Sequence, residues 1–290
     1  MSSENKSFIK RFKKKSGDNP NAEMSFVEHL EDLRWHVVRS LIAILAGSII
    51  VFAKIEYVVN NILMGPVHKD FITYRWLCLL SEKLQFRELC LQDVSLKFLS
   101  NAMTEQFLMT FSLAFTGGFV LAFPYVFWQL WRFISPALSK KEKKYTTGAI
   151  VWVSLLFFTG VLFGYIVLTP FMVNFYSSYS LSPLIEFRPS IGDYFENLLY
   201  LTVGVGILFQ LPVVILMLTK IGIISPFTLK QIRKYAFVVI LILAAAITPS
   251  TDPFSLTLVT LPLYMLYEFS IILSARAFKK TQETKVEQWD

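Results

Sequence analysis

Residues 131–145 read WRFISPALSKKEKKY and follow an apolar stretch rich in aromatic side chains. Lysines that come directly after such a stretch are typical of the cytoplasmic side of a membrane span. The segment therefore predicts a helix that crosses a membrane and ends at its inner face. Glu142 stands alone among four lysines here. Because a carboxylate does not help to orient the chain, this acid needs another explanation.

The composition of the whole chain indicates a polytopic membrane protein. Hydrophobic residues make up 54% of its 290 residues and charged residues only 17%, whereas soluble domains have roughly a quarter of their residues charged. We expect an all-α fold over residues 24–276, with a basic tail at 1–23 and a second tail at 277–290. Apolar windows bounded by charged or turn residues predict six transmembrane helices, at about 35–55, 104–130, 146–169, 194–219, 235–249 and 254–273.

The distribution of basic residues predicts the orientation of these spans. An even number of spans places both ends of the chain on one side. Of the 28 lysines and arginines, 20 fall in the two tails and the loops predicted on that side, and only six fall in the opposite loops. Because cytoplasmic loops are enriched in Lys and Arg, we expect both termini in the cytoplasm.

The last two predicted helices are short. About 14 residues separate Tyr235 from the turn ITPSTDP, and a rise of about 1.5 Å per residue gives roughly 21 Å, against a hydrocarbon core of about 30 Å. We therefore expect helices five and six to form a hairpin that stops short of the outer surface. Local thinning of the bilayer would accommodate it.

Two polar side chains stand out inside the predicted spans. Gln210 is near the middle of the fourth span and Glu268 is toward the cytoplasmic end of the sixth. Polar groups in hydrocarbon are costly and often functional. For Gln210 the alternatives are an interhelical hydrogen bond that only holds the bundle together and a contact with a partner. For Glu268 the alternatives are a side chain that extends to the membrane interface and a side chain with a buried role.

Acidic side chains also gather ahead of the first span. Residues 25–38 have apolar positions at helical spacing, which predicts an amphipathic helix on the inner surface. Its polar face includes Glu31, Asp32 and Arg34. These acids and Glu142 lie on the same predicted side and can together hold a cation. Guanidinium groups fit best, because their planar fork pairs with carboxylates through two hydrogen bonds.

Four blocks of the sequence, in order, resemble the TatC family. They are MSFVEHLEDLR, WRFISPALSKKEKK, FQLPVVILMLTKIGI followed by SP, and ITPSTDPFS leading to LPLYMLYE. The similarity covers roughly residues 24–276. TatC proteins are the multi-spanning core of the Sec-independent, twin-arginine protein translocase. The resemblance implies a receptor for twin-arginine signal peptides in a bacterial-type cytoplasmic membrane, which uses the proton-motive force and is not an enzyme.

The resemblance also implies roles for individual residues. The signal-peptide carboxylates of the family fall on Glu142 and Asp32, with Arg34 in the same motif. The family commonly has Glu at the position of Asp32, so the side chain here is one methylene shorter. Gln210 matches a position where the family has Glu or Gln, and its neutral side chain favours a partner contact over proton transfer. Asp252 matches an outer acid of the family with a structural or partner-related role, and Pro66 matches a proline of the first outer loop, which helps to shape the outer cap.

The partners implied by the resemblance are small single-span proteins of the TatA and TatB type, further copies of this chain, and the signal peptides of folded precursors. No nucleic acid, cofactor or metal is expected. The three histidines do not have metal-ligand spacing, and the chain has no HExxH, Gly-rich phosphate loop or CxxC motif. The alternative function is secondary transport of a small solute, although that class should show internal repeats and ionisable groups at the midplane.

The predicted outer loop 56–102 is long and contains both cysteines of the chain, Cys78 and Cys90. In an oxidising compartment they can form a disulfide. A reduced pair fits the sequence equally well, and the resemblance does not require the bridge.

Overall fold

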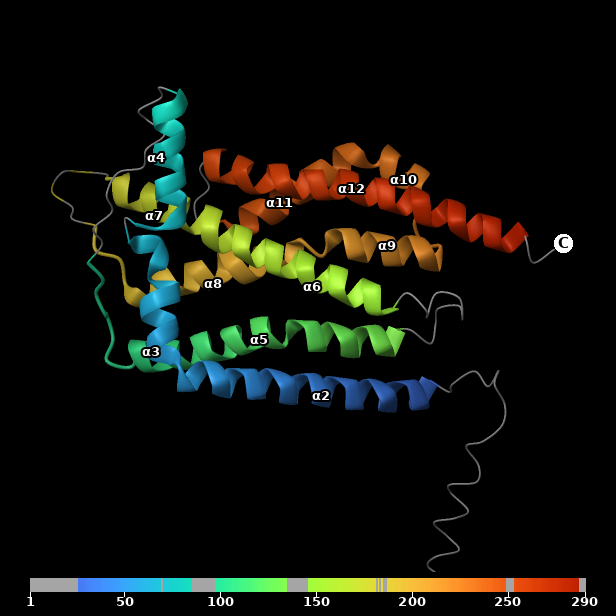
Figure 1. The fold of residues 1–290 in the computed structure, drawn as a ribbon, viewed down its shortest axis with the longest axis horizontal. Coiled ribbons are helices and arrows are strands. Elements are labelled where there is room, and N and C mark those ends of the chain that lie inside the picture. The colour runs from blue at the N-terminus through green and yellow to red at the C-terminus, as the bar shows by residue number, and fades with distance from the viewer. Residues whose placement is uncertain are drawn as a thin grey trace, which may run out of the picture.

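The protein is an α-helical bundle in a computed structural model. The structure describes residues 26–68, 70–84, 97–134, 146–180, 182, 184, 187–248 and 253–286. Within these segments the chain is almost entirely helical, and its one extended pairing is an isolated bridge between Leu99 and Ser190. The long helices run roughly parallel and antiparallel to one another (Figure 1). The all-α prediction is therefore confirmed.

The elements follow the predicted order of spans. They are α2 (Phe26–Ala53), α3 (Ile55–Tyr57), η1 (Val58–Leu63), η2 (Gly65–Val67), α4 (Ile72–Leu84), α5 (Glu105–Ile134), α6 (Thr146–Phe163), η6 (Gly164–Leu168), α7 (Thr169–Ser178), α8 (Ile191–Leu208), α9 (Leu211–Ile221), α10 (Pro226–Gln231), α11 (Arg233–Ile247) and α12 (Pro253–Val286). Five helical segments, in α2, α5, α6 through α7, α8 through α9, and α12, are long and apolar enough to cross a membrane. The apolar helix α11 lies between the last two of these.

The fifth and sixth predicted helices differ from each other in length. Helix α11 has 15 residues, about 22 Å at the usual rise, so the prediction of a short fifth helix is confirmed. The prediction of a short sixth helix was wrong, because α12 has 34 residues. No glycine or proline follows Pro262 in α12, so nothing interrupts the helix where its apolar part ends. The predicted C-terminal tail is thus helical to Val286.

The first residues of α2 and the last residues of α12 lie at the same end of the bundle (Figure 1). We call this the terminal end and the opposite one the cap end. Helix α5 finishes and α6 begins at the terminal end, as the sequence predicted for the lysine-rich loop. The segments α3, η1, η2 and α4 gather at the cap end, where α4 runs across the direction of the long helices (Figure 1).

Small residues allow the helices to pack closely. A Cβ atom added at Gly47 of α2 would lie 2.8 Å from the carbonyl oxygen of Gly118 in α5. A Cβ atom at Gly160 of α6 would lie 2.8 Å from Cα of Gly206 in α8. Close backbone approach at small residues is how helices associate in lipid, where apolar side chains gain little by leaving the bilayer.

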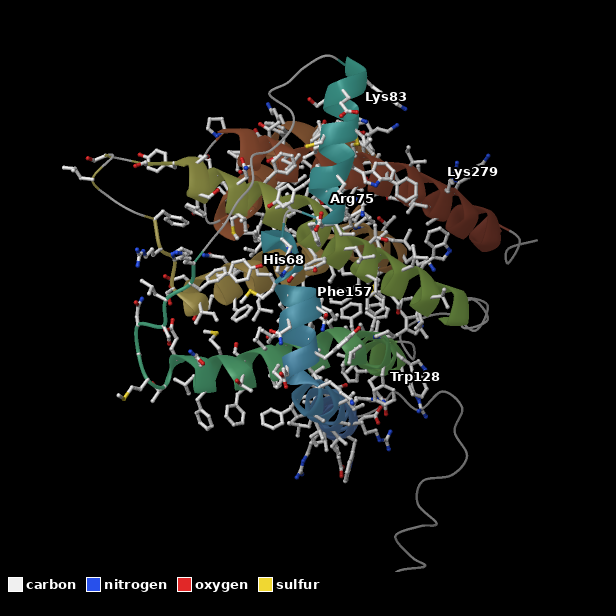
Figure 2. All side chains as sticks on the ribbon, turned by 60° about the vertical axis from the view of Figure 1, so that its left-hand side comes forward. His68, Arg75, Lys83, Trp128, Phe157 and Lys279 are labelled. Carbon is white, nitrogen blue, oxygen red and sulfur yellow. The ribbon has the colours of Figure 1, made fainter. Side chains whose placement is uncertain are left out.

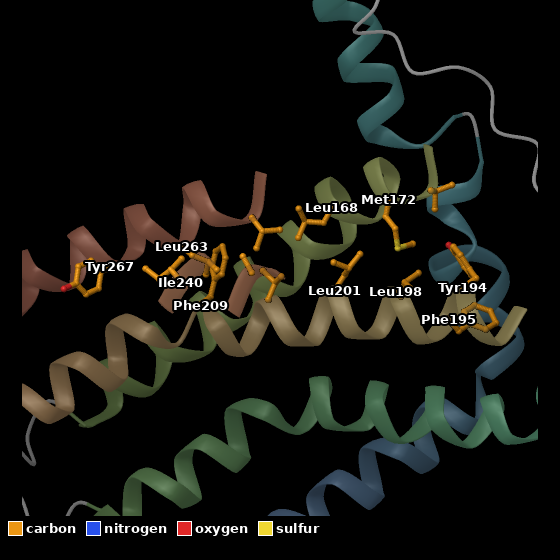
Figure 3. Packing of buried hydrophobic residues seen from close by; sticks show 14 of the residues in the cluster. Leu168, Met172, Tyr194, Phe195, Leu198, Leu201, Phe209, Ile240, Leu263 and Tyr267 are labelled. Atoms are coloured by element: carbon orange, nitrogen blue, oxygen red, sulfur yellow. The ribbon is translucent and has the colours of Figure 1, made fainter. Parts of the chain in front are cut away.

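The buried core follows α8 and joins it to η6, α7, α11 and α12. Leu198 and Leu201 of α8 meet Leu168 and Met172 from the preceding segment (Figure 3). A second cluster, between α5 and α6, contains stacked rings whose centroids are 3.6 Å apart, those of Phe123 and Phe157. Figure 2 shows Phe157 inside the bundle, and its side chain is completely buried.

Tyrosine hydroxyls fasten the cap to the bundle. Tyr74 of α4 donates a hydrogen bond to the carbonyl of Pro66, at 2.9 Å, and also approaches the carbonyl of Pro170, at 3.4 Å. Tyr194 of α8 donates to the carbonyl of Leu63, at 2.7 Å. Pro66 is buried within η2. Pro66, which was predicted in the first outer loop, therefore lies within the packed cap.

Replacement of Tyr74 by phenylalanine is expected to loosen the cap without unfolding the bundle. The buried carbonyl of Pro66 would lose its donor, which costs about 1–3 kcal/mol locally. Hydrogen exchange of the amides in residues 58–67 should become faster. Tyr57→Phe is the control, because the Tyr57 side chain is 62% exposed. Equal exchange rates in the two variants would contradict this role.

The Tyr74 contact also predicts a dependence on pH. Burial raises the pKa of Tyr74 to about 12, because the phenolate would be poorly solvated. The neutral donor is therefore favoured in the folded protein. Its contribution to stability is present below about pH 10 and is lost as the pH rises through the raised value.

Candidate functional site

The terminal end holds the described members of the predicted acidic site. Glu31, Asp32 and Arg34 all lie near the start of α2. Glu31 and Arg34 are exposed, and the Asp32 side chain is 48% exposed. Helix α2 is continuous from Phe26 to Ala53, so the predicted amphipathic helix and the first span form a single helix. The acids are thus carried by a rigid element.

Several predicted residues lie outside the described segments. Glu142 and the lysines around it fall in 135–145, Asp252 falls in 249–252, and Cys90 falls in 85–96. Their roles, including the alternative states of Cys78 and Cys90, stay predictions. Glu142 follows Ile134, the last residue of α5, by eight positions.

A buried polar contact joins α2 to α5 beside Asp32. His36 Nδ1 lies 2.6 Å from Gln129 Oε1, and Gln129 Nε2 donates to the Tyr125 hydroxyl at 2.7 Å. Since an amide oxygen only accepts, Nδ1 is the donor. On the other side of the ring, His36 Nε2 lies 3.8 Å from Asp32 Oδ2. We call His36, Gln129 and Tyr125 the polar link, which lies one helical turn from Asp32.

The sequence interpretation missed His36 and Gln129. His36 entered it only as a histidine without metal-ligand spacing, and Gln129 stands next to the aromatic residues at the end of the second span. A search for polar residues within predicted spans would have found both. What the sequence does not show is that they face each other, because the two are separated by 93 positions.

Gln210 lies at a break in the fourth span. Helix α8 ends at Leu208 and α9 begins at Leu211, with Pro212 in its first turn. Proline has no amide hydrogen and cannot continue the hydrogen bonding of α8. Gln210 Nε2 makes a long contact of 3.4 Å with the carbonyl of Val153. Its Oε1 is buried and has no hydrogen-bond partner, so the side chain is only partly satisfied.

Glu268 is paired with a basic side chain on the neighbouring helix. Its Oε2 lies 2.8 Å from Arg233 of α11, and its Oε1 accepts from the Tyr264 hydroxyl at 3.2 Å. The carboxylate is one-third exposed. Helices α2 and α12 lie on opposite sides of the bundle (Figure 1), so the fold does not bring Glu268 together with Asp32.

Two further kinds of site, a metal centre and a ligand cavity, are relevant to the described residues. Nowhere among them do three or more His, Cys, Asp or Glu side chains gather in a way that could hold a metal ion. A cavity of about 250 Å³ lies at the cap end, and its lining includes Met172, Tyr176, Asp193 and Asn197. These lining residues belong to α7 and the first turns of α8.

Comparisons with known proteins agree with this architecture. The profile of the family described as Sec-independent protein translocase protein (TatC) matches residues 28–262. The TatC protein of Blattabacterium sp. subsp. Periplaneta americana is 39% identical over 264 residues, which are 90% of this chain and 99% of that protein. The TatC protein of Aquifex aeolicus is 33% identical over 90% of this chain and 98% of its own length.

A solved structure has the same fold. A crystal structure of the twin-arginine translocase receptor TatC in the detergent DDM superposes with a TM-score of 0.68 and 32% sequence identity, covering 85% of this chain and 99% of that one. These comparisons do not support the alternative of a small-solute transporter. The chain is a multi-pass membrane protein that belongs to the TatC family, the core of the Sec-independent protein translocase.

Proposed function

We propose that this protein binds the twin-arginine signal peptides of folded precursors at its terminal end, which faces the cytoplasm. The observation that carries the proposal is the Asp32 carboxylate, half-exposed on α2 and at the end of the bundle where α5 finishes and α6 begins. These two helices flank Glu142 in the sequence. Glu31 and Arg34 flank Asp32 and complete the described part of the surface. The membrane is the bacterial cytoplasmic membrane.

The chemistry of the two carboxylates supports recognition of paired arginines. A hydrogen bond to a charged group contributes about 1.5–3 kcal/mol. Two arginines on two carboxylates can thus supply much of a micromolar affinity, which is about 8 kcal/mol. Arginine forms two parallel bonds with one carboxylate, whereas lysine acts as a point charge. This difference in hydrogen bonding favours arginine over lysine at both positions of the signal-peptide pair.

Transport itself needs partners and an energy source. We infer that single-span proteins of the TatA and TatB type, together with further copies of this chain, assemble around the bundle. The proton-motive force supplies about 2.3 kcal/mol per charge for each 100 mV. Local bilayer thinning beside the short helix α11 would ease passage of a folded cargo.

Peptide binding tests the receptor function directly. Purified protein in lipid nanodiscs would be titrated with fluorescent signal peptides that carry either paired arginines or paired lysines. We expect the arginine peptide to bind at least about tenfold more tightly, the equivalent of one lost charge-assisted bond. Equal dissociation constants for the two peptides would contradict recognition by carboxylates.

Replacement of Gln210 by leucine is expected to separate stability from function. The wild-type amide has one buried atom without a partner, so an apolar side chain of similar size should leave the unfolding temperature unchanged or raise it. If the amide contacts a partner helix during transport, export should nevertheless fall. Gln210→Glu tests the same position with a family-like side chain. Full export by the leucine variant would exclude the partner contact.

A further inference from the structure

The polar link is placed where it can control the geometry of the proposed site. Gln129 is 1% exposed and His36 7% exposed, so both are removed from water in an apolar part of the bundle. Buried polar groups are costly unless they are hydrogen-bonded. Gln129 uses its oxygen for His36 and its nitrogen for Tyr125. Both ends of the amide are therefore engaged, which fixes its orientation.

The fixed amide in turn orients the imidazole. Because Gln129 Oε1 accepts from His36 Nδ1, the opposite ring nitrogen, Nε2, faces Asp32. The His36 ring also packs edge-on against Phe133, with centroids 6.4 Å apart. Asp32 and His36 are on α2, whereas Gln129 and Phe133 are on α5. Since Asp32 lies one turn before His36 on α2, the bond between His36 and Gln129 holds the turn of α2 that carries Asp32 against α5.

Helix α5 is also the element that leads to the second proposed carboxylate. It ends at Ile134, eight positions before Glu142. Adjacent arginines in an extended peptide can engage Asp32 and Glu142 at once only if α2 keeps a fixed register with the end of α5, after which the sequence leads to Glu142. We propose that Gln129 and His36 are positioning residues that hold this register and so make the receptor require both arginines. The inference rests on the proposed receptor function.

The link is not needed to hold the two helices together. The close contact of Gly47 with Gly118 lies near the middle of α5 and toward the end of α2, and Gly118 precedes Gln129 by 11 positions, about 16 Å along α5. Helices α2 and α5 run side by side over their length (Figure 1). Removal of the link should therefore change recognition more than it changes folding.

The test compares binding of four signal peptides, with RR, RK, KR or KK, to the full-length protein in nanodiscs. In Gln129→Leu we expect the RR peptide to lose at least about tenfold in affinity while the KK peptide binds as it does to the wild type. The preference for RR over KK should then nearly disappear. Gln129→Glu is the conservative control, because its carboxylate can accept from both His36 and the Tyr125 hydroxyl. It should keep the preference.

A second variant tests the same role independently, in case Gln129→Leu does not fold. His36→Phe breaks the link from α2 and keeps an aromatic ring against Phe133, and it should lose the RR preference in the same way. If the leucine or phenylalanine variant keeps the wild-type preference, or if RR and KK binding fall by the same factor, the positioning role is wrong. If the wild type itself does not distinguish RR from KK, the receptor function fails, and this inference fails with it.

Discussion

Replacement of Glu142 by alanine or glutamine is expected to abolish export of twin-arginine precursors while the protein stays in the membrane. The physical reason is the loss of one of two carboxylates that hold the paired arginines. One charge-assisted bond contributes about 1.5–3 kcal/mol, so binding should weaken by a factor of about ten to a hundred or more. Glutamine keeps the size of the side chain and removes only its charge. Export would be measured as the processed precursor outside the membrane.

The control for this prediction is an acid at the other end of the bundle. Glu56 is an exposed residue of α3 in the cap, and Glu56→Gln should export normally. The amount of each variant in the membrane must match the wild type. Normal export by the Glu142 variants at equal membrane levels would remove this residue from the signal-peptide site.

Replacement of Gly118 by leucine is expected to prevent correct packing of α2 against α5. A Cβ atom at Gly118 would already lie 2.7 Å from Cα of Ser48, and backbone cannot move aside as a flexible side chain can. Overpacking of this kind costs about 1–3 kcal/mol and sometimes more. The polar link between the same helices would be displaced as well. We expect a large fall in the fraction of monodisperse protein after heating in detergent.

Gly148→Leu is the matched control for this substitution. Gly148 is exposed in the first turn of α6, and an added Cβ atom there would meet nothing within 4 Å. Leucine also has a higher helix propensity than glycine, by roughly 0.8 kcal/mol. This variant should be as stable as the wild type or more so. Similar losses in both variants would show that close glycine contact is not what holds α2 to α5.

Hydropathy was sufficient to predict the order of the apolar helical segments. Apolar windows report whole helices, so the five segments long enough to cross a membrane and the short α11 follow the predicted order. Helix ends and breaks, which depend on single residues, could not be predicted from hydropathy. The sequence showed Pro212 but not that the helix stops at Leu208, and it did not show that α12 extends to Val286.

The candidate site could be predicted only in part, for a physical reason. Asp32 belongs to a cluster of acids that is visible along the chain, and its chemistry follows from its side chain. His36 and Gln129 are visible as polar residues within predicted spans, but their contact becomes evident only when α2 and α5 are known to be neighbours. Contacts between helices distant in the sequence depend on packing at positions such as Gly47 and Gly118, which periodicity does not reveal.

Site-specific photocrosslinking would test the receptor function most directly. A photoreactive amino acid would replace Lys141 or Lys143, on either side of Glu142, and membranes would be mixed with a precursor that carries paired arginines or paired lysines in its signal. We predict a crosslink to the signal peptide that requires the arginines and disappears in Glu142→Ala. An equally strong crosslink to the lysine precursor, or none at all in correctly inserted protein, would contradict the proposed function.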